Sequence, residues 1–142
     1  MKLSSLIAFN GILFIALGIA FALYGPLMMA FFNVPELSID STTYWHLAAF
    51  GRMFGAALFG YGFLLWALRG AVEEMPAAKR RSIGMALLLG NLLAAVVSIT
   101  QQSSIWYNAA GWVTTGIFAG LTLAYGAMLI SARTPKSAGA AR

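Results

Sequence analysis

The sequence predicts an all-α fold, an integral membrane, antiparallel four-helix bundle with both termini in the cytoplasm. Composition is the first indication, because 61% of the 142 residues are hydrophobic and only 9% are charged, whereas charged residues make up about 25% of a soluble domain. Long apolar segments and an uneven distribution of lysine and arginine are the other two. The chain is therefore too apolar to be a soluble globular domain.

Four apolar segments divide the chain, at about residues 5–30, 44–69, 82–100 and 112–131. Each approaches or exceeds the roughly 20 residues that cross a hydrocarbon core about 30 Å thick. Because the hydrocarbon offers no hydrogen-bond partners for open backbone, each segment is expected to be helical. We expect one four-helix domain, residues 1–142, ending in a short mobile tail at residues 132–142.

The orientation follows from the basic residues. All nine lysines and arginines except Arg52 fall on one side of the predicted bundle; they are Lys2, Arg69, Lys79, Arg80, Arg81, Arg133, Lys136 and Arg142. The connections on the other side, residues 31–43 and 101–111, contain none. Because basic connections stay in the cytoplasm, both termini are predicted to be cytoplasmic. The expected location is the bacterial inner membrane.

The chemistry available to the chain is limited. It has no cysteine, one histidine and four acidic residues, and all the acids lie in the connections. The predicted helix interiors therefore contain no acid–base pair, no Ser-His-Asp set and no metal-ligand spacing, so we expect neither an enzyme nor a metal site. The net charge of +5 comes from short basic runs between apolar segments, which indicates topology rather than nucleic-acid binding.

Arg52 is the one charged residue well inside an apolar segment, about 10 Å past Trp45 along the second predicted helix. Because a charge at membrane depth is costly, it must be compensated. The preferred interpretation is that Arg52 reaches toward the membrane surface and pairs with Glu36 or Asp40. The alternative is that it anchors a lipophilic ligand, such as a lipid or a quinone.

Polar residues at helical spacing in the third and fourth segments are expected to face inward. Together with Arg52 they define a predicted ligand-binding or structural cluster near the outer side of the membrane: Arg52, Asn91, Ser98, Gln102, Asn108 and Thr115. His46, at the start of the second segment, is a possible ligand for haem or for the magnesium of a chlorin. A lone histidine at an interface is more often hydrated, so no cofactor is predicted.

Glycines at helical spacing predict where helices approach closely, since helices in lipid associate through small residues. The predicted packing positions are Gly11, Gly18, Gly51, Gly55, Gly62, Gly116 and Gly120. Contacts within one bundle are preferred over a dimer interface.

Three stretches resemble a widespread family of uncharacterised four-helix bacterial small integral membrane proteins: GRMFGAALFGYGFLLWALR at residues 51–69, GNLLAAVVSITQQ at 90–102 and NAAGW at 108–112. The matching positions are Arg52 with Gly55, Gly90 with Asn91, and Asn108 with Gly111 and Trp112. The likeness covers Leu47 to Leu129, while the region of Trp45 and His46 is less typical. It implies a four-helix fold and a membrane location, without implying an activity.

By elimination, the sequence favours a non-enzymatic accessory or scaffold subunit that packs against other integral membrane proteins in a larger complex. The alternative is a binding or carrier protein for a lipophilic molecule in an outer-leaflet pocket around Arg52. Expected partners are membrane lipids and other membrane subunits, with no nucleic acid.

Overall fold

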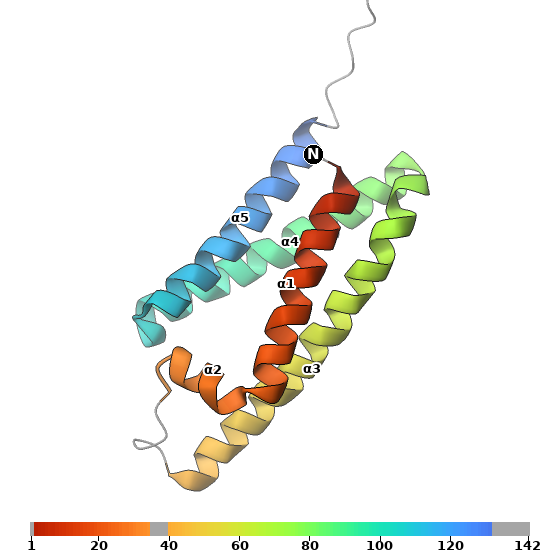
Figure 1. Ribbon diagram of the computed structural model, residues 1–142. Coiled ribbons are helices and arrows are strands. Elements are labelled where there is room, and N and C mark those ends of the chain that lie inside the picture. Colours follow the sequence, from red (N-terminus) through yellow and green to blue (C-terminus); the bar gives the residue numbers. More distant parts are fainter. Residues whose placement is uncertain (1, 35–39, 132–142) are drawn as a thin grey trace, which may run out of the picture.

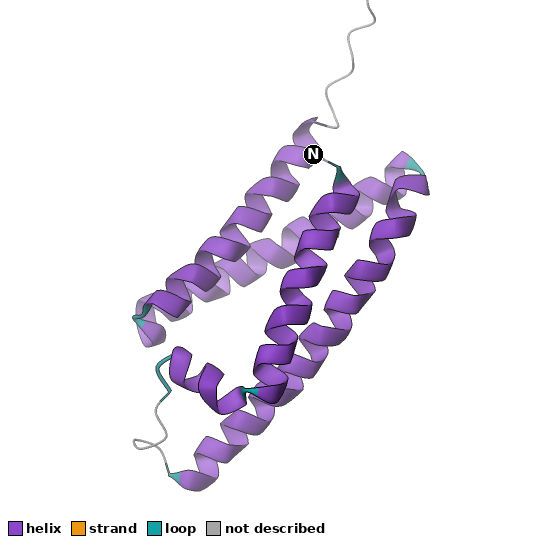
Figure 2. Ribbon diagram, in the orientation of Figure 1, coloured by secondary structure: helices purple, strands orange, loops and turns teal. Residues whose placement is uncertain are grey.

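The computed structural model describes residues 2–34 and 40–131, and over these residues the chain is helical without strands (Figures 1 and 2). Its elements are α1 (Leu3–Leu23), α2 (Gly25–Phe31), α3 (Ser41–Ala71), the 3₁₀ turn η2 (Val72–Glu74), α4 (Ala77–Gln101), the π-helical turn η3 (Gln102–Trp106) and α5 (Ala109–Ser131). Four helices, α1, α3, α4 and α5, are long and apolar enough to cross a membrane. The predicted all-α fold with four such helices is therefore confirmed. The predicted tail, residues 132–142, lies outside the described residues.

The predicted first helix, residues 5–30, is divided into α1 and α2. Tyr24 has non-helical dihedral angles of φ −115° and ψ 36°, and Pro26 stands in the first turn of α2. Proline has no backbone N–H and clashes with the preceding turn, so α1 cannot run through it unchanged. The chain turns at this point, and α2 runs across the end of the molecule toward the connection between α4 and α5 (Figure 1).

The other long helices extend beyond their predicted bounds, and in α3 and α5 a capping side chain accounts for the earlier start. Asp40 is the N-cap of α3, where its side chain accepts a hydrogen bond of 3.0 Å from the Thr43 backbone N–H. Asn108 does the same for α5, accepting 2.8 Å from Gly111 N–H. Such side chains satisfy backbone donors that have no partner in the first turn of a helix. The α3 and α5 helices accordingly begin at Ser41 and Ala109, rather than at residues 44 and 112.

The four long helices are arranged as two pairs, α1 with α3 and α4 with α5 (Figure 1). Glycines form the α1–α3 contact. A Cβ at Gly18 would lie 2.5 Å from the Phe59 nitrogen, and one at Gly62 would lie 2.8 Å from the Gly11 carbonyl oxygen. The two backbones are therefore in direct contact, as is usual where small residues pair in transmembrane helices.

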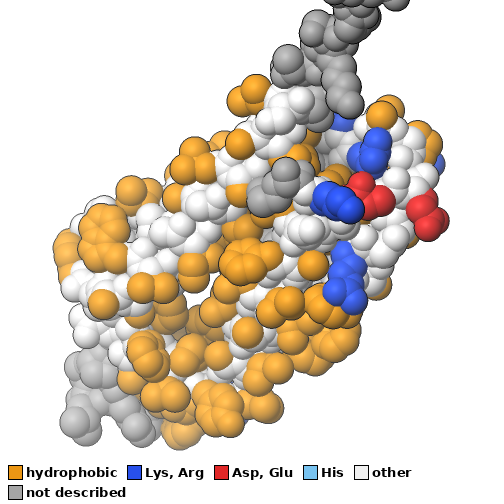
Figure 3. Space-filling view, turned by 45° about the horizontal axis from the view of Figure 1, so that its top comes forward, with side chains coloured by type: hydrophobic (Ala, Val, Ile, Leu, Met, Phe, Trp, Pro, Cys, Tyr) orange, Lys and Arg blue, Asp and Glu red, His pale blue; other side chains and the backbone are white. Residues whose placement is uncertain are grey.

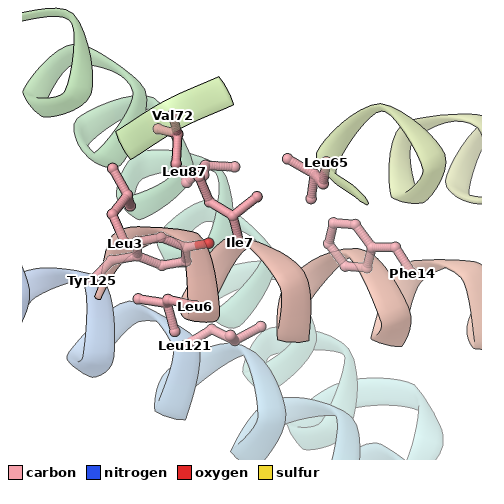
Figure 4. Packing of buried hydrophobic residues seen from close by; sticks show 9 residues of the cluster. All are labelled: Leu3, Leu6, Ile7, Phe14, Leu65, Val72, Leu87, Leu121 and Tyr125. Atoms are coloured by element: carbon pink, nitrogen blue, oxygen red, sulfur yellow. The ribbon is translucent and has the colours of Figure 1, made fainter. Parts of the chain in front are cut away.

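The two pairs meet in a buried cluster at the end of the molecule where α1 begins (Figure 4). Its members come from α1, α3, η2, α4 and α5: Leu3, Leu6, Ile7, Phe14, Leu65, Val72, Leu87, Leu121 and Tyr125. Asn10 of α1 donates a hydrogen bond of 3.4 Å to the hydroxyl of Tyr125 of α5, with both residues fully buried. This end also carries Lys2, Arg69, Lys79, Arg80 and Arg81, and we call it the basic end.

At the opposite end, which we call the aromatic end, α2 joins the two pairs. The Asn108 side-chain amide donates 2.7 Å to the Phe31 carbonyl oxygen. The rings of Phe32 and Trp106 lie 4.7 Å apart between centroids, and Asn33 donates 3.4 Å to the Trp106 carbonyl oxygen. The two helix pairs are therefore joined at both ends, by apolar packing at the basic end and by α2 at the aromatic end.

Candidate functional site

A groove lies between α1 and α5, with a volume of about 490 Å³. This volume is within the range of about 300–1,000 Å³ that is usual for ligand sites. The lining residues are Ser5, Leu6 and Phe9 from α1, and Gly116, Ile117, Gly120, Leu121 and Ala124 from α5. Ser5 is the only one of these residues with a polar side chain, so the groove offers an almost wholly apolar surface.

The groove exists because three of its five α5 lining residues, Gly116, Gly120 and Ala124, have no side chain or only a methyl group. Nothing lies within 4 Å of the position that a Cβ would occupy at Gly116 or at Gly120, so the groove is open beside both glycines. Leu6 and Leu121 are buried and point toward one another at the base (Figure 4). Phe9, 59% exposed, forms the α1 wall. A large residue at either glycine would fill the space.

One end of the groove lies close to the basic end of the molecule. Ser4, next to Ser5, donates its backbone N–H to Glu73 Oε1 at 3.0 Å, and Glu73 Oε2 lies 3.5 Å from Arg80 Nη1. These contacts hold the start of α1 against the η2–α4 connection. Figure 3 shows the lysine and arginine side chains gathered around the acidic ones at this end. The exposed Arg80–Glu73 pair contributes little to stability by itself, about 0–1 kcal/mol.

A second feature of the basic end is the stacking of Arg69 on Trp66, one turn apart near the end of α3. The guanidinium carbon lies 3.3 Å from the centroid of the indole ring. Such cation–π contacts fix the position of the arginine while leaving its N–H groups at the edge of the plane. This side chain is therefore held where α3 reaches the basic end.

Four residues of the predicted polar cluster lie together at the aromatic end of the α4–α5 pair. The hydroxyls of Ser98 and Thr115 are 2.9 Å apart, Gln102 packs against Gly111, and Asn108 caps α5. Thr115 also bonds the Gly111 carbonyl oxygen at 2.9 Å. The Gln102 Oε1 atom is buried without a hydrogen-bond partner within the described residues. The arrangement connects α4 to α5.

Asn91 and Arg52 are not part of this group. Asn91 lies about two turns nearer the basic end on α4, buried, and donates 2.8 Å to the Leu87 carbonyl oxygen. Arg52 is exposed on α3, beside the start of α2, where a Cβ at Gly25 would lie 3.5 Å from its Cγ. Because α3 lies away from the connection between α4 and α5 (Figure 1), Arg52 is separated from the polar residues near that connection.

The expected pairing of Arg52 with Asp40 does not occur in the structure. Among the described residues, the salt bridge is the one between Arg80 and Glu73, while Asp40 is occupied as the α3 cap. Hydrogen bonds from the side chain and backbone of Thr43 hold the pKa of Asp40 below its ordinary value. Glu36, the other predicted partner, lies outside the described residues.

The remaining predicted positions divide into two groups. Gly11, Gly18, Gly55 and Gly62 lie in the α1–α3 contact, whereas Gly51, Gly116 and Gly120 have nothing within 4 Å of a Cβ position. His46 is exposed on α3, and no group of three potential metal ligands occurs in residues 2–34 and 40–131. Ligation of haem or chlorin by His46 stays an expectation.

The sequence interpretation did not include the α1 side of the groove, Ser5, Leu6 and Phe9. The sequence feature that could have indicated the groove is the row of small residues Gly116, Gly120 and Ala124 on α5, because the facing residues of α1, Leu6 and Phe9, are large. Comparison of the chain with protein-family models, with curated proteins and with solved structures found no match. The resemblance to the four-helix family therefore stays a prediction.

Proposed function

We propose that this protein is a non-enzymatic, multi-pass protein of the bacterial inner membrane that binds a membrane lipid in the groove between α1 and α5. The observation that carries the proposal is the groove itself, about 490 Å³ of almost wholly apolar space. It is formed by two helices that are each long and apolar enough to cross a membrane. An occupant of such a groove exchanges contacts with bilayer lipid for contacts with protein, so shape and packing decide its affinity.

The orientation is part of this proposal. The described basic residues Lys2, Arg69, Lys79, Arg80 and Arg81 belong to one end of the molecule. Asp40 and the aromatic contacts of α2 belong to the other. By the positive-inside rule, the basic end lies in the cytoplasm. Both chain termini are then cytoplasmic, and the four spans are antiparallel. The α1 side of the groove, Ser5 to Phe9, then lies in the cytoplasmic leaflet, and the α5 side, Gly116 to Ala124, spans the middle of the membrane.

The proposed site differs from the pocket around Arg52, which the sequence offered as the alternative site for a lipophilic ligand. The α1 helix has 21 residues and is therefore about 31 Å long, close to the hydrocarbon thickness of about 30 Å. Arg52 packs beside Gly25, just past the end of α1. Because α1 ends near the edge of the hydrocarbon layer, this position supports an interfacial guanidinium that is in contact with water. The carbonyl end of the α1 dipole also stabilises its positive charge.

A second candidate function is the accessory or scaffold subunit. The observation in its favour is that Gly116, Gly120 and Ala124 are spaced four residues apart on α5 and line the open groove. Small residues at this spacing allow a helix of another protein to approach closely. The same surface would then accept a transmembrane helix instead of a lipid.

The test is to fill the groove and measure what remains bound. We expect Gly120→Leu to lose lipid that co-purifies with the wild-type protein in mild detergent, measured by native mass spectrometry. Gly90→Leu is the matched control, because Gly90 is an exposed helical glycine on α4 that also has nothing within 4 Å of a Cβ position. Equal lipid retention in both variants would contradict the proposal. Loss of a co-purifying protein from Gly120→Leu alone would favour the scaffold function.

A further inference from the structure

We propose that the groove selects an anionic phospholipid of the leaflet at the basic end, with one acyl chain along α5 and the phosphate at Lys2. This inference rests on the proposed lipid-binding function and adds to it the class of lipid, its direction and the residue that recognises its charge. Three observations support it: the direction of the groove, its length, and the charge at one of its ends.

The groove runs along the helix axes rather than across them. On α1 its lining proceeds from Ser5 to Phe9, away from the basic end, and on α5 it proceeds from Ala124 to Gly116 in the same direction. The stretch from Gly116 to Ala124 corresponds to about 12 Å of helix. One leaflet contributes about half of a hydrocarbon core roughly 30 Å thick. On α5 this stretch is centred on the middle of the helix, whereas Ser5 lies near the start of α1. The groove therefore runs from near the basic end to the middle of the membrane, which is the direction of an acyl chain in the leaflet at that end.

The headgroup of such a lipid would lie at the end of the groove where Lys2 is found. Lys2 is the exposed N-cap residue of α1, with extended dihedral angles of φ −80° and ψ 144°. Its carbonyl oxygen accepts a 3.3 Å hydrogen bond from Leu6 N–H, so its backbone is fixed at the start of the helix. Positions three, four and seven residues apart share one face of a helix. Ser5, Leu6 and Phe9 are three, four and seven residues from Lys2, so Lys2 stands at the basic end of the α1 face that lines the groove.

The charge around Lys2 is complementary to a phosphate. Glu73, beside the start of α1, accepts a hydrogen bond from Ser4 N–H and pairs with Arg80, and it also interacts electrostatically with Lys2. The described basic residues of this end, Lys2, Arg69, Lys79, Arg80 and Arg81, outnumber its acids, Glu73 and Glu74, so the local net charge is positive and favours an anion. A zwitterionic headgroup would gain less from these residues, because its own ammonium group would be repelled by them. The apolar groove and the basic end together fit an anionic phospholipid better than a neutral one.

The probe for the test is an equimolar mixture of phosphatidylglycerol and phosphatidylcholine with identical acyl chains, presented to the delipidated full-length protein and analysed by native mass spectrometry. We expect wild-type protein to bind phosphatidylglycerol about fivefold in excess, the effect of one basic side chain near a membrane surface. Lys2→Gln should reduce this ratio to near one while total bound lipid stays similar. Lys79→Gln, a basic residue of the same end on α4, should keep most of the preference.

The outcomes separate the inference from the function on which it rests. Loss of both lipids in Gly120→Leu with retention in Gly90→Leu supports a lipid in the groove. If wild-type protein then binds both lipids equally, or Lys2→Gln keeps its preference, the anionic assignment is overturned while lipid binding stands. If Gly120→Leu binds both lipids as wild type does, the groove is not the lipid site and both proposals are overturned. Co-purification of another membrane protein in place of lipid would also overturn the assignment of a phospholipid to the groove.

Discussion

Gly18 of α1 lies directly against Gly55 of α3, with the Gly55 carbonyl oxygen 2.8 Å from the position that a Gly18 Cβ would take. Gly11 and Gly62 make a similar contact two turns away along α1. Together the two contacts bring the backbones of α1 and α3 directly against each other. Neither helix has room for a side chain at these positions. The α1 wall of the groove is thereby held in place by α3.

The first prediction follows from this contact. Gly55→Leu forces the two backbones apart and should lower the free energy of unfolding by about 3 kcal/mol, the upper part of the usual range for overpacking. Gly60→Leu is the control on the same helix, since nothing lies within 4 Å of its Cβ position. Thermal melting in detergent, followed by circular dichroism, measures both. Equal Tm values for the two variants would contradict the assignment of this contact.

A second prediction concerns the double role of Asn108, whose side chain caps α5 and also holds α2 through the Phe31 carbonyl oxygen. Asn108→Asp keeps the capping oxygen and removes the amide donor, so amide exchange should increase in residues 25–33 and stay low at the start of α5. Asn108→Ala removes both and should cost about 1 kcal/mol more through the lost cap. If exchange in α2 is the same in wild type and Asn108→Asp, the proposed connection through α2 is wrong.

The stability of the protein should depend on pH through the Asp40 cap of α3. The pKa of Asp40 is lower in the folded protein than its ordinary value of 3.8, because Thr43 donates hydrogen bonds to the carboxylate. A depressed folded-state pKa means that the stabilisation is present above 3.8 and is lost as the pH falls through the folded value. Asp40→Asn can still cap α3 but does not titrate. The stability advantage of wild type over this variant should therefore shrink below pH 3.8, and parallel pH profiles would refute the cap.

Arg52 should be nearly independent of Asp40. Since Asp40 is occupied as a helix cap and Arg52 packs beside Gly25, a double-mutant cycle of Arg52→Met and Asp40→Asn should give a coupling within about 0.5 kcal/mol of zero. The measurement is the Tm of the four proteins. A coupling well above this value would restore the pairing that the sequence suggested.

The orientation can be tested with single cysteines, because the natural chain has none. Ser103→Cys, at the aromatic end, should react with a membrane-impermeant thiol reagent added to intact spheroplasts. Ser82→Cys, at the start of the α4 apolar run near the basic end, should react only after the membrane is opened. Labelling of Ser82→Cys alone in intact spheroplasts would reverse the proposed topology.

The helical segments were predictable because length and apolar composition leave few alternatives for such a chain. The break between α1 and α2 was not predicted, since Pro26 near the end of an apolar run is compatible with either a helix end or a change of direction. Ser98, Gln102, Asn108 and Thr115 lie near one another because a short connection joins the helices that carry them, and their role as a site stays a prediction. Arg52 was misplaced because its neighbours depend on where α1 ends.

The glycines illustrate a second limit of the sequence. Gly11 with Gly18 on α1 and Gly116 with Gly120 on α5 are both pairs of glycines at helical spacing, yet the first pair contacts the backbone of α3 and the second borders open space. Which faces are used within the chain depends on how the two helix pairs are positioned. That positioning is set by long-range contacts such as Asn10 with Tyr125, and spacing along the sequence does not reveal them.

The open side at Gly116 and Gly120 has a kinetic consequence for the proposed function. A closed cavity would admit a lipid only when the helices around it separate, which is a slow collective motion. Here a molecule can slide in sideways from the surrounding bilayer without any helix moving. Exchange should then be fast, at a rate set by lateral diffusion and by release of the headgroup from Lys2. Occupancy would follow the lipid composition of the membrane from moment to moment.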